Sequence, residues 1–255
     1  MYQPWIEGVV KYDLSNNGAL LTVLPGRDLN FLHYFITGLI FDPNGKKPKS
    51  VRRNEMKIIV VGATGTIGKS VVKALSGRHE ILKVSQSGGD VQVDLAIPDS
   101  IKKMYRAIGE FDAVVCAAGV ARFGMLDDLT DEDYGIGLEN KLMGQVNLVC
   151  FGHKLIRDKG SFTLTSGVLS QEPVVGSSAI SMVNAGVEAF VRAASLELQR
   201  GIRINAVSPI WVSETLKAMG RDSAAGMPAE ETAIAYVESV EGQYNGKVLD
   251  VRQVG

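Results

Sequence analysis

The sequence predicts an α/β fold: a doubly wound, mostly parallel seven-stranded sheet with helices on both faces. Residues 58–61 form a continuous apolar run, which is typical of a strand covered on both sides, and a glycine-rich turn leads from it directly into a helix. From there, strand and helix patterns alternate along the chain, as they do in βαβ units. Right-handed crossovers between such units give a Rossmann-like arrangement that binds its ligand at the carboxyl ends of the strands.

The other elements follow in order. Apolar and β-branched runs predict strands at 80–85, 91–95, 112–117, 161–165, 202–207 and 246–251. Helical patterns predict helices at 66–75, 98–108, 130–155 and 181–200, and a last helix that ends near residue 240. Pro98 opens the second of these helices, and Thr130 with Asp133 forms a capping pattern at the start of the third.

The length and charge of the chain bound its organisation. It has 255 residues, of which 45% are hydrophobic, and a formal net charge of −1. These values predict a single domain over residues 56–255 and an N-terminal extension over residues 1–55. Met56 stands directly before the first strand, so the extension is either upstream of the natural start or a genuine accessory segment. The near-neutral charge argues against nucleic acid as a partner.

Three further observations exclude other classes of protein. The apolar segment 29–41 is too short to span a bilayer, so no membrane association is expected. The three histidines share no metal-ligand spacing, which predicts no metal site. Cys116 and Cys150 lie in apolar stretches and are expected to be buried free thiols in a reducing compartment. The chain is therefore expected to be cytoplasmic.

The glycine-rich turn is the strongest functional signal. Gly62, Gly65 and Gly68 follow the first strand at intervals of three. Glycine at such positions lets the backbone turn sharply, approach a pyrophosphate and pack the helix on the strand, while the first amides of the helix face the anion. The spacing is not the G-x-G-x-x-G form, and an ordinary tight turn without a ligand is the alternative.

Five motifs then occur in a fixed order: Val61–Gly68, Asp94–Leu95, Ala117–Gly119, Thr165–Ser166 and Arg203–Pro209. Together they resemble the short-chain dehydrogenase/reductase family, and the resemblance covers residues 56–255. It implies an oxidoreductase that uses a nicotinamide cofactor on a small carbonyl or alcohol substrate and that assembles as a homodimer or homotetramer. It also places Trp211 and Met227 in a short loop that covers the substrate.

The resemblance implies which residues contact the cofactor. The diphosphate and the adenosine ribose would be surrounded by Gly62, Thr64, Gly65, Thr66, Ile67 and Gly68. The adenine would be contacted by Asp94 and Leu95, and Ala117, Ala118 and Gly119 would pass beneath the nicotinamide-side ribose. The nicotinamide would be lined by Pro209, Ile210 and Val212, although the family usually has glycine at the position of Ile210.

The end of the second strand distinguishes NADP from NAD. An acidic residue there binds the ribose 2′-hydroxyl and repels a 2′-phosphate. This chain has Ser85, Gln86 and Ser87 at that point, which carry no negative charge and can donate hydrogen bonds. NADP is therefore predicted. Because no arginine in this loop would neutralise the phosphate, NAD remains the alternative, as does a loop that is merely solvated.

The chain departs from the family in its catalytic residues. The family normally carries Tyr-x-x-x-Lys on the helix after the fifth strand, where the tyrosine donates a proton to the carbonyl and the lysine lowers its pKa. Alignment of that helix places Ile180 at the tyrosine and Asn184 at the lysine. Lys141 stands where the family has asparagine, and Ser166 is retained.

The predicted catalytic residues are therefore Ser166, Lys141 and Asn184. We expect Lys141 to reach the nicotinamide ribose or the substrate oxygen, with Ser166 polarising that oxygen. A surface lysine and a serine that caps a strand end are the alternative.

Three functions remain open at this point. The first is an NADP-dependent oxidoreductase with atypical catalytic residues, since hydride transfer itself is cofactor chemistry. The second is a catalytically silent NADP-binding sensor or partner subunit, which the missing proton donor favours. The third, an extended relative or NADP-sensing regulator, needs a larger C-terminal region than the one that follows Pro209.

Overall fold

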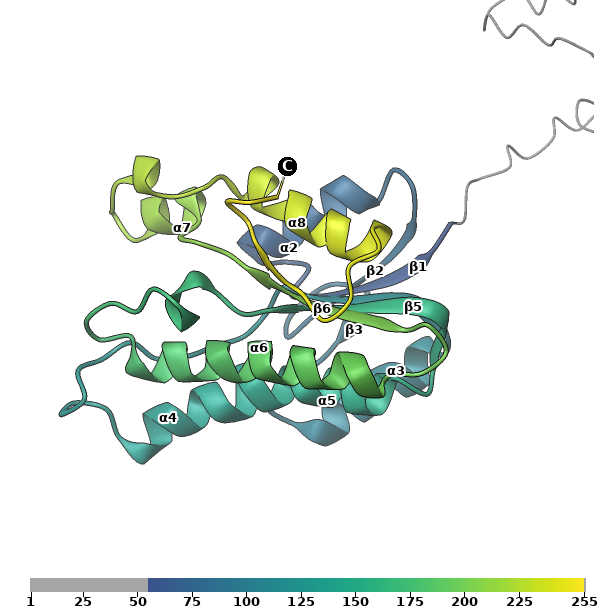
Figure 1. The fold of residues 1–255 in the computed structure, drawn as a ribbon, viewed down its shortest axis with the longest axis horizontal. Helices are drawn as coiled ribbons and strands as arrows, with labels where there is room; N and C mark the ends of the chain where they lie inside the picture. The colour runs from purple at the N-terminus through teal and green to yellow at the C-terminus, as the bar shows by residue number, and fades with distance from the viewer. Residues whose placement is uncertain (1–54, 255) are drawn as a thin grey trace, which may run out of the picture. The chain divides into compact units, whose positions relative to one another are not determined.

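The computed structural model describes residues 55–254, which form the predicted α/β domain (Figure 1). Seven strands make one sheet in the order β3-β2-β1-β4-β5-β6-β7, and each adjacent pair is parallel. The strands are β1 (Lys57–Val61), β2 (Glu80–Ser85), β3 (Val91–Gln92), β4 (Phe111–Cys116), β5 (Ile156–Thr165), β6 (Arg203–Ser208) and β7 (Val248–Asp250). The doubly wound, seven-stranded prediction is confirmed. From β1 to β3 the successive strands are added on one side of β1, and from β4 onward they are added on its other side. Folds of this type bind their ligands at this switch point, between β1 and β4.

Helices cover both faces of the sheet (Figure 1). One face carries α2 (Thr66–Leu75) and α8 (Ala229–Glu241); the other carries α3 (Pro98–Ile108), α4 (Asp131–Gly137), α5 (Gly144–Gly152) and α6 (Ser178–Glu197). The shorter segments are η1 (Leu138–Met143), η2 (Val168–Ser170), α7 (Ser213–Ala218) and η3 (Ser223–Ala225).

Strand β1 supplies both hydrophobic cores of the domain. Ile59 and Val61 pack on the α3, α5 and α6 side, whereas Ile58 and Val60 pack on the α2 and α8 side. Successive side chains of a strand point to opposite faces, so a strand covered on both sides is apolar throughout. Each fully buried residue of this kind contributes about 1.5–3 kcal/mol. The glycine turn therefore follows a strand that is packed tightly on both faces.

The predicted helix over 130–155 is wrong in two respects. A π-helical turn, η1, interrupts it between α4 and α5, and the helix ends at Gly152 rather than Leu155. A Cβ atom at Gly152 would lie 2.6 Å from the Tyr105 hydroxyl, so the chain passes close to α3 there. β5 begins earlier than predicted, at Ile156.

Other element boundaries also differ from the predictions. The strand predicted at 91–95 ends at Gln92, because the Asp94 amide donates to Ser100 Oγ and the Asp94 carboxylate accepts from the Ala96 amide. Polar side chains thus compete with the sheet for these backbone groups. The helix predicted at 181–200 runs from Ser178 to Glu197. Arg200 and Gly201 adopt positive φ angles of 61° and 70° in the turn that leads to β6.

The expectations for the extension and the cysteines have different outcomes. Residues 1–54, which contain nearly all of the predicted N-terminal extension, lie outside the described part of the chain. Cys116 and Cys150 are free thiols, as predicted, but only Cys116 is buried and Cys150 is exposed. None of the helices between residues 55 and 254 combines the length and the apolar character needed to cross a membrane.

Candidate functional site

The glycine turn joins β1 to α2 in a conformation that needs glycine. Gly62 has a φ angle of +82°, and a Cβ atom there would lie 2.7 Å from the Ala117 carbonyl oxygen at the end of β4. A Cβ atom at Gly68 would collide with the Gly62 carbonyl oxygen. At Gly65 the nearest atom to such a Cβ is the Gly62 oxygen at 3.3 Å, so the outer side of the turn is open. Gly62 and Gly68 are thus needed for close packing of the backbone, whereas Gly65 keeps the outer side of the turn free of side-chain atoms.

The N-terminus of α2 can bind an anion. Its N-cap is Gly65, no side chain caps it, and its first turn contains no acidic residue. Thr64 and Thr66 are exposed beside it, and Ile67 is half-buried. The first amides of a helix have no partner within the helix and lie at the positive end of its dipole. The structure therefore brings an open backbone surface and unpaired amides together at this turn, as a diphosphate requires.

The loop after β2 is closed by its own side chains. Ser85 is buried and donates to the carbonyl oxygens of Ser87 and Gly88, at 3.1 and 2.9 Å. The Ser87 side chain is exposed. A Cβ atom at Gly88 would lie 3.8 Å from the Thr64 methyl group, which places this loop beside the glycine turn. Of the two predicted serines, Ser87 is thus the one that points outward.

Asp94 and Leu95 lie next to this loop. The Asp94 carboxylate accepts a hydrogen bond from Gln86 Nε2 at 3.3 Å, and Leu95 is buried. A Cβ atom at Gly144 would lie 2.8 Å from Leu95 Cβ, so α5 packs directly on this residue. The predicted adenine contacts thus lie beside the loop after β2.

The ends of β4 and β6 border the same edge of the sheet. The Ala117 amide donates to the Val61 carbonyl at 2.8 Å, and Ala118 follows it half-buried. After β6, the Pro209 carbonyl accepts from the Val168 amide at 2.9 Å. Ile210 is half-buried, and Val212 is buried and pairs with Met227 in an isolated bridge. The segments predicted to lie beneath and beside the nicotinamide thus flank β5.

Lys141 lies in the π-helical turn η1 and is buried, with 7% of its surface exposed. Its Nζ atom donates to the Ser166 carbonyl oxygen at 3.1 Å. A Cβ atom at Gly119 would lie 2.9 Å from Lys141 Cγ, so Lys141 passes directly over that glycine. No carboxylate among the described residues forms an ion pair with it. Burial lowers the pKa of Lys141 to about 8.

Asn184 contacts the neighbouring peptide group. Its Nδ2 atom donates to the Gly167 carbonyl oxygen at 3.3 Å, while its buried Oδ1 atom has no hydrogen-bond partner. The Ser166 hydroxyl makes one long contact, at 3.4 Å, with the Val207 carbonyl oxygen. Lys141, Ser166 and Asn184 are therefore gathered at the end of β5.

Gln145 was not predicted and fixes the position of η1. It is fully buried; its Nε2 atom donates to the carbonyl oxygens of Lys141 and Thr165, each at 2.9 Å, and its Oε1 atom accepts from the Thr165 amide at 2.7 Å. The available signal was a polar residue within an otherwise apolar helical stretch. Asn140, also unpredicted, accepts from the Val120 amide at 2.9 Å and thereby ties η1 to the loop after β4.

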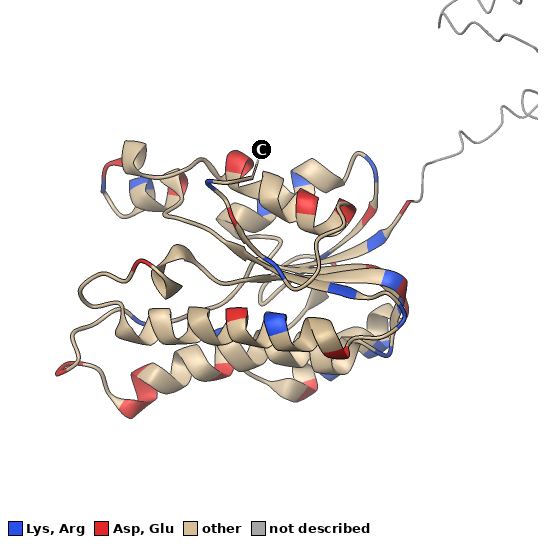
Figure 2. Ribbon diagram, in the orientation of Figure 1, with Lys and Arg blue, Asp and Glu red and all other residues tan. Residues whose placement is uncertain are grey.

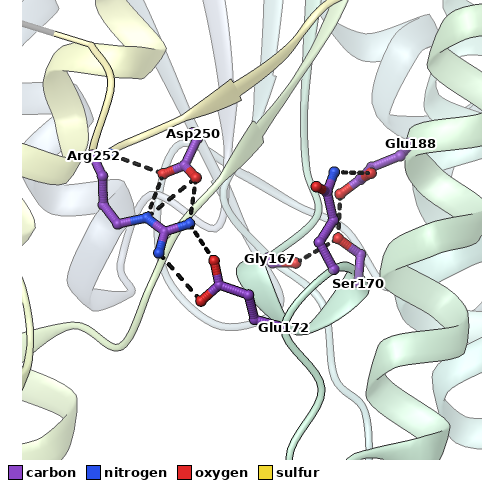
Figure 3. A network of polar contacts seen from close by, with 7 residues as sticks. Gly167, Ser170, Glu172, Glu188, Asp250 and Arg252 are labelled. Carbon is purple, nitrogen blue, oxygen red and sulfur yellow. Dashed lines mark hydrogen bonds and ion pairs between the residues drawn. The ribbon is translucent and has the colours of Figure 1, made fainter.

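The loop after β5 is held from two sides (Figure 3). Ser170 donates to the buried carboxylate of Glu188 on α6. Two residues further along, Glu172 forms a two-point contact with the guanidinium group of Arg252, which also binds Asp250 at the end of β7. The backbone that carries the carbonyl oxygens of Ser166 and Gly167 is thus anchored at its far end.

Comparisons with known proteins agree with this geometry. Residues 49–241 match the family model described as enoyl-(acyl carrier protein) reductase. The protein lin1944 from Listeria innocua has a solved structure that is 40% identical, with a TM-score of 0.74, and the match covers 77% of this chain and 99% of that one. The chain belongs to the short-chain dehydrogenase/reductase family.

Two further relatives of this short-chain dehydrogenase/reductase are less similar in sequence. Hydroxynaphthalene reductase arp2 from Aspergillus fumigatus is 24% identical over 196 residues, which cover 72% of this chain and 70% of that protein. A small-chain dehydrogenase solved in complex with NADPH is 27% identical, with a TM-score of 0.67, and the match covers 77% of this chain and 96% of that one. This chain is thus a short-chain dehydrogenase/reductase-type oxidoreductase, and its family uses NAD or NADP.

The residues of this short-chain dehydrogenase/reductase fit a bound dinucleotide. The uncapped N-terminus of α2 suits the diphosphate, and the unpaired Oδ1 atom of Asn184 is a buried acceptor that a ribose hydroxyl would satisfy. Half-buried Ile180 lies one helical turn before Asn184 and supplies no titratable group. The ionisable group beside Ser166 is Lys141.

Proposed function

We propose that this chain is an NADP(H)-dependent oxidoreductase that interconverts a small carbonyl compound and its alcohol, with Lys141 and Ser166 serving the substrate oxygen. The observation that carries the proposal is the buried ammonium group of Lys141, 3.1 Å from the Ser166 carbonyl oxygen. A buried cation without a carboxylate partner is costly to the folded state. Such groups are concentrated at sites where the charge is used.

Lys141 has the chemistry of the proton donor. An ammonium group has three N–H donors, and the hydrogen bond to Ser166 uses one of them. A pKa of about 8 leaves the group protonated at neutral pH and ready to release its proton. The bound cofactor would supply the hydride. Lys141 would then protonate the oxygen of the reduced substrate, and in the reverse direction the neutral amine would remove that proton.

Ser166 would polarise the same oxygen. Its hydroxyl group is buried, and its contact with the Val207 carbonyl is at the long limit of a hydrogen bond. It can therefore turn toward a substrate oxygen at little cost. Such a donor strengthens its hydrogen bond as negative charge develops on the carbonyl oxygen. Asn184 would hold the nicotinamide-side ribose through its unpaired Oδ1 atom.

NADP is the proposed cofactor. The end of β2 carries no acidic side chain that would repel a 2′-phosphate, and the exposed Ser87 hydroxyl can donate to one. The structural neighbour solved with NADPH supports the same choice. A small-molecule substrate is part of this proposal, as is assembly of the chain as a homodimer or homotetramer.

A second function is favoured by one specific observation. α6 carries Ile180 where the family has its tyrosine, so the helix supplies no proton donor at that position. If Lys141 serves only to hold the cofactor, the chain is a silent NADP-binding sensor or partner subunit.

The deciding experiment compares cofactor binding with turnover. Calorimetric titration with NADPH and NADH is followed by a panel of carbonyl and alcohol substrates monitored at the nicotinamide absorbance. We expect Lys141→Met to lose turnover by at least about 100-fold and to retain most of its NADPH affinity. Lys247→Met, at an exposed lysine, is the matched control.

The outcomes separate the functions. NADPH binding without turnover on any substrate would support the sensor. Full turnover by Lys141→Met would remove Lys141 from the chemistry. A folded chain that binds neither cofactor would overturn both functions.

A further inference from the structure

Two aromatic side chains from distant loops stack on each other. Phe123 lies between β4 and α4, and Trp211 lies between β6 and α7. Their ring centroids are 5.8 Å apart, and the ring planes are 28° from parallel. In the sheet, β5 lies between β4 and β6, and Ser166 follows β5 directly. The pair therefore joins the two loops across the strand that ends at the candidate site.

Both loops begin at residues of that site. Phe123 follows Gly119, which Lys141 passes over, by four residues. Trp211 follows Pro209, whose carbonyl oxygen holds the Val168 amide in the loop after Ser166. That third loop is also tied in, since the Gly124 amide donates to the Gly176 carbonyl at 3.0 Å. Loops from three adjacent strands thus meet beside the aromatic pair.

These loops expose several apolar side chains. Phe123 leaves 45% of its surface in solvent. The first and third loops also expose five aliphatic side chains: Val120, Met125, Leu126, Val174 and Val175. Exposed apolar side chains gathered in this way are typical of a ligand-binding surface. The guanidinium group of Arg221 lies 5.9 Å from the centre of the Trp211 ring and supports it.

The charges nearby select against anionic substrates. Beyond Phe123 the first loop continues into the start of α4, and Figure 2 shows acidic residues gathered there. They are Asp127, Asp128, Asp131, Glu132 and Asp133. Two basic residues lie near these acidic ones or near the aromatic pair: Arg122, 3.8 Å from Asp133, and Arg221, beside Trp211. A substrate carried on a phosphorylated or acidic carrier would meet repulsion at this entrance.

On the basis of the proposed reductase activity, we infer that Phe123 and Trp211 form an aromatic wall of the substrate site, and that the preferred carbonyl substrate carries a flat, uncharged, apolar ring. Such a ring would stack on the exposed face of Phe123, with its carbonyl oxygen directed to Lys141 and Ser166. A sugar would bring hydroxyl groups against apolar side chains that cannot pair with them.

The test compares three ketones with NADPH present: tetralone, which has an aromatic ring; decalone, its saturated counterpart; and an acetoacetyl thioester of coenzyme A. We expect kcat/KM for tetralone to exceed that for decalone by about five- to ten-fold, as stacking allows. Phe123→Leu should remove most of this preference, and Phe123→Tyr should keep it. Leu196→Ala, at a residue 83% exposed on α6, should change nothing. Equal use of tetralone and decalone, or a preference for the thioester, would overturn the inference.

A binding measurement makes the inference testable even without turnover. Trp211 is one of two tryptophans, so Trp5→Phe leaves it as the single reporter. Naphthol, which cannot be reduced as a ketone, should quench its fluorescence with saturation, and Phe123→Leu should weaken that binding about five-fold. Saturable quenching in a chain that fails to bind NADPH would count against the proposed activity and for the wall. NADPH binding without naphthol quenching would count against the wall alone.

Discussion

Lys141 and Asn184 donate hydrogen bonds to the carbonyl oxygens of two consecutive residues, Ser166 and Gly167. One donor comes from the π-helical turn η1 and the other from α6. The two helices thus converge on two consecutive peptide groups directly after β5. Gly167, with a φ angle of +156°, leads into the short turn η2, and the two side chains hold these peptide groups in place.

The buried lysine predicts how stability depends on pH. The pKa of Lys141 is lowered from 10.5 to about 8, so between these values the unfolded chain binds a proton that the folded chain does not. The free energy of unfolding should therefore rise as the pH increases through this window. Lys141→Met should remove that rise and stabilise the fold at pH 7 by about 1–3 kcal/mol. Denaturant titrations at several pH values measure both effects. Lys247→Met should retain the rise, and a Lys141→Met chain that retained it would contradict the assignment.

Gln145 should be among the most sensitive polar positions. Gln145→Leu removes three buried hydrogen bonds, one from the Thr165 amide and two to the carbonyl oxygens of Lys141 and Thr165. We expect a loss of about 2–4 kcal/mol in the free energy of unfolding, measured by urea denaturation. Gln243→Leu, at an exposed glutamine, is the control and should change stability by less than about 0.5 kcal/mol. A stable Gln145→Leu chain would show that η1 is held by packing alone.

Substitutions at two glycines of the turn should have different effects, one on cofactor binding and the other on folding. Gly65 has a φ angle of −76°, which alanine adopts, so Gly65→Ala should fold with a small shift of the Gly62 carbonyl, 3.3 Å from the new methyl group, which would lie beside the diphosphate. We expect NADPH affinity to fall by about ten-fold with little change in unfolding free energy. Gly68→Ala should instead destabilise the fold, because its methyl group collides with the Gly62 carbonyl. Unchanged affinity in Gly65→Ala would place the diphosphate elsewhere.

The cofactor preference should respond to one added charge. Ser87→Asp places a carboxylate at the exposed tip of the loop after β2, where it would repel a 2′-phosphate and accept from a 2′-hydroxyl. NADPH affinity should fall by about ten-fold or more, while NADH affinity should hold or improve. Gln92→Asp, on the neighbouring strand β3, controls for net charge. Equal losses for both cofactors would mean that the loop does not contact the 2′-position.

The sheet could be predicted from the sequence because its strands are buried on both faces. The apolar run Ile58–Val61 and the glycines after it leave few alternatives, and β1 occupies the expected place. Boundaries failed where polar side chains take backbone groups away from the sheet, as Ser100 does at Asp94. Those contacts depend on the folded loop, so they have no simple sequence signal.

The candidate site was predictable in part. Alignment brought Lys141 and Asn184 to the end of β5, where both bond to adjacent carbonyl groups. The sequence could not indicate that Ser85 uses its hydroxyl within its own loop, nor that Phe123 reaches Trp211 across β5. Both depend on the path of loops that have no periodic pattern.

The turn η1 contains one more residue than a regular helical turn would hold. Removing any single residue between Leu138 and Met143 would rotate the upstream and downstream halves of the helix by about 100° relative to each other. With α5 fixed by Gln145, α4 and its contact with α6 would then turn away, although no site residue had been replaced. The position of the Lys141 ammonium group thus depends on the number of residues in η1 as well as on their identity. An insertion or deletion in η1 would therefore disable the protein more thoroughly than most substitutions.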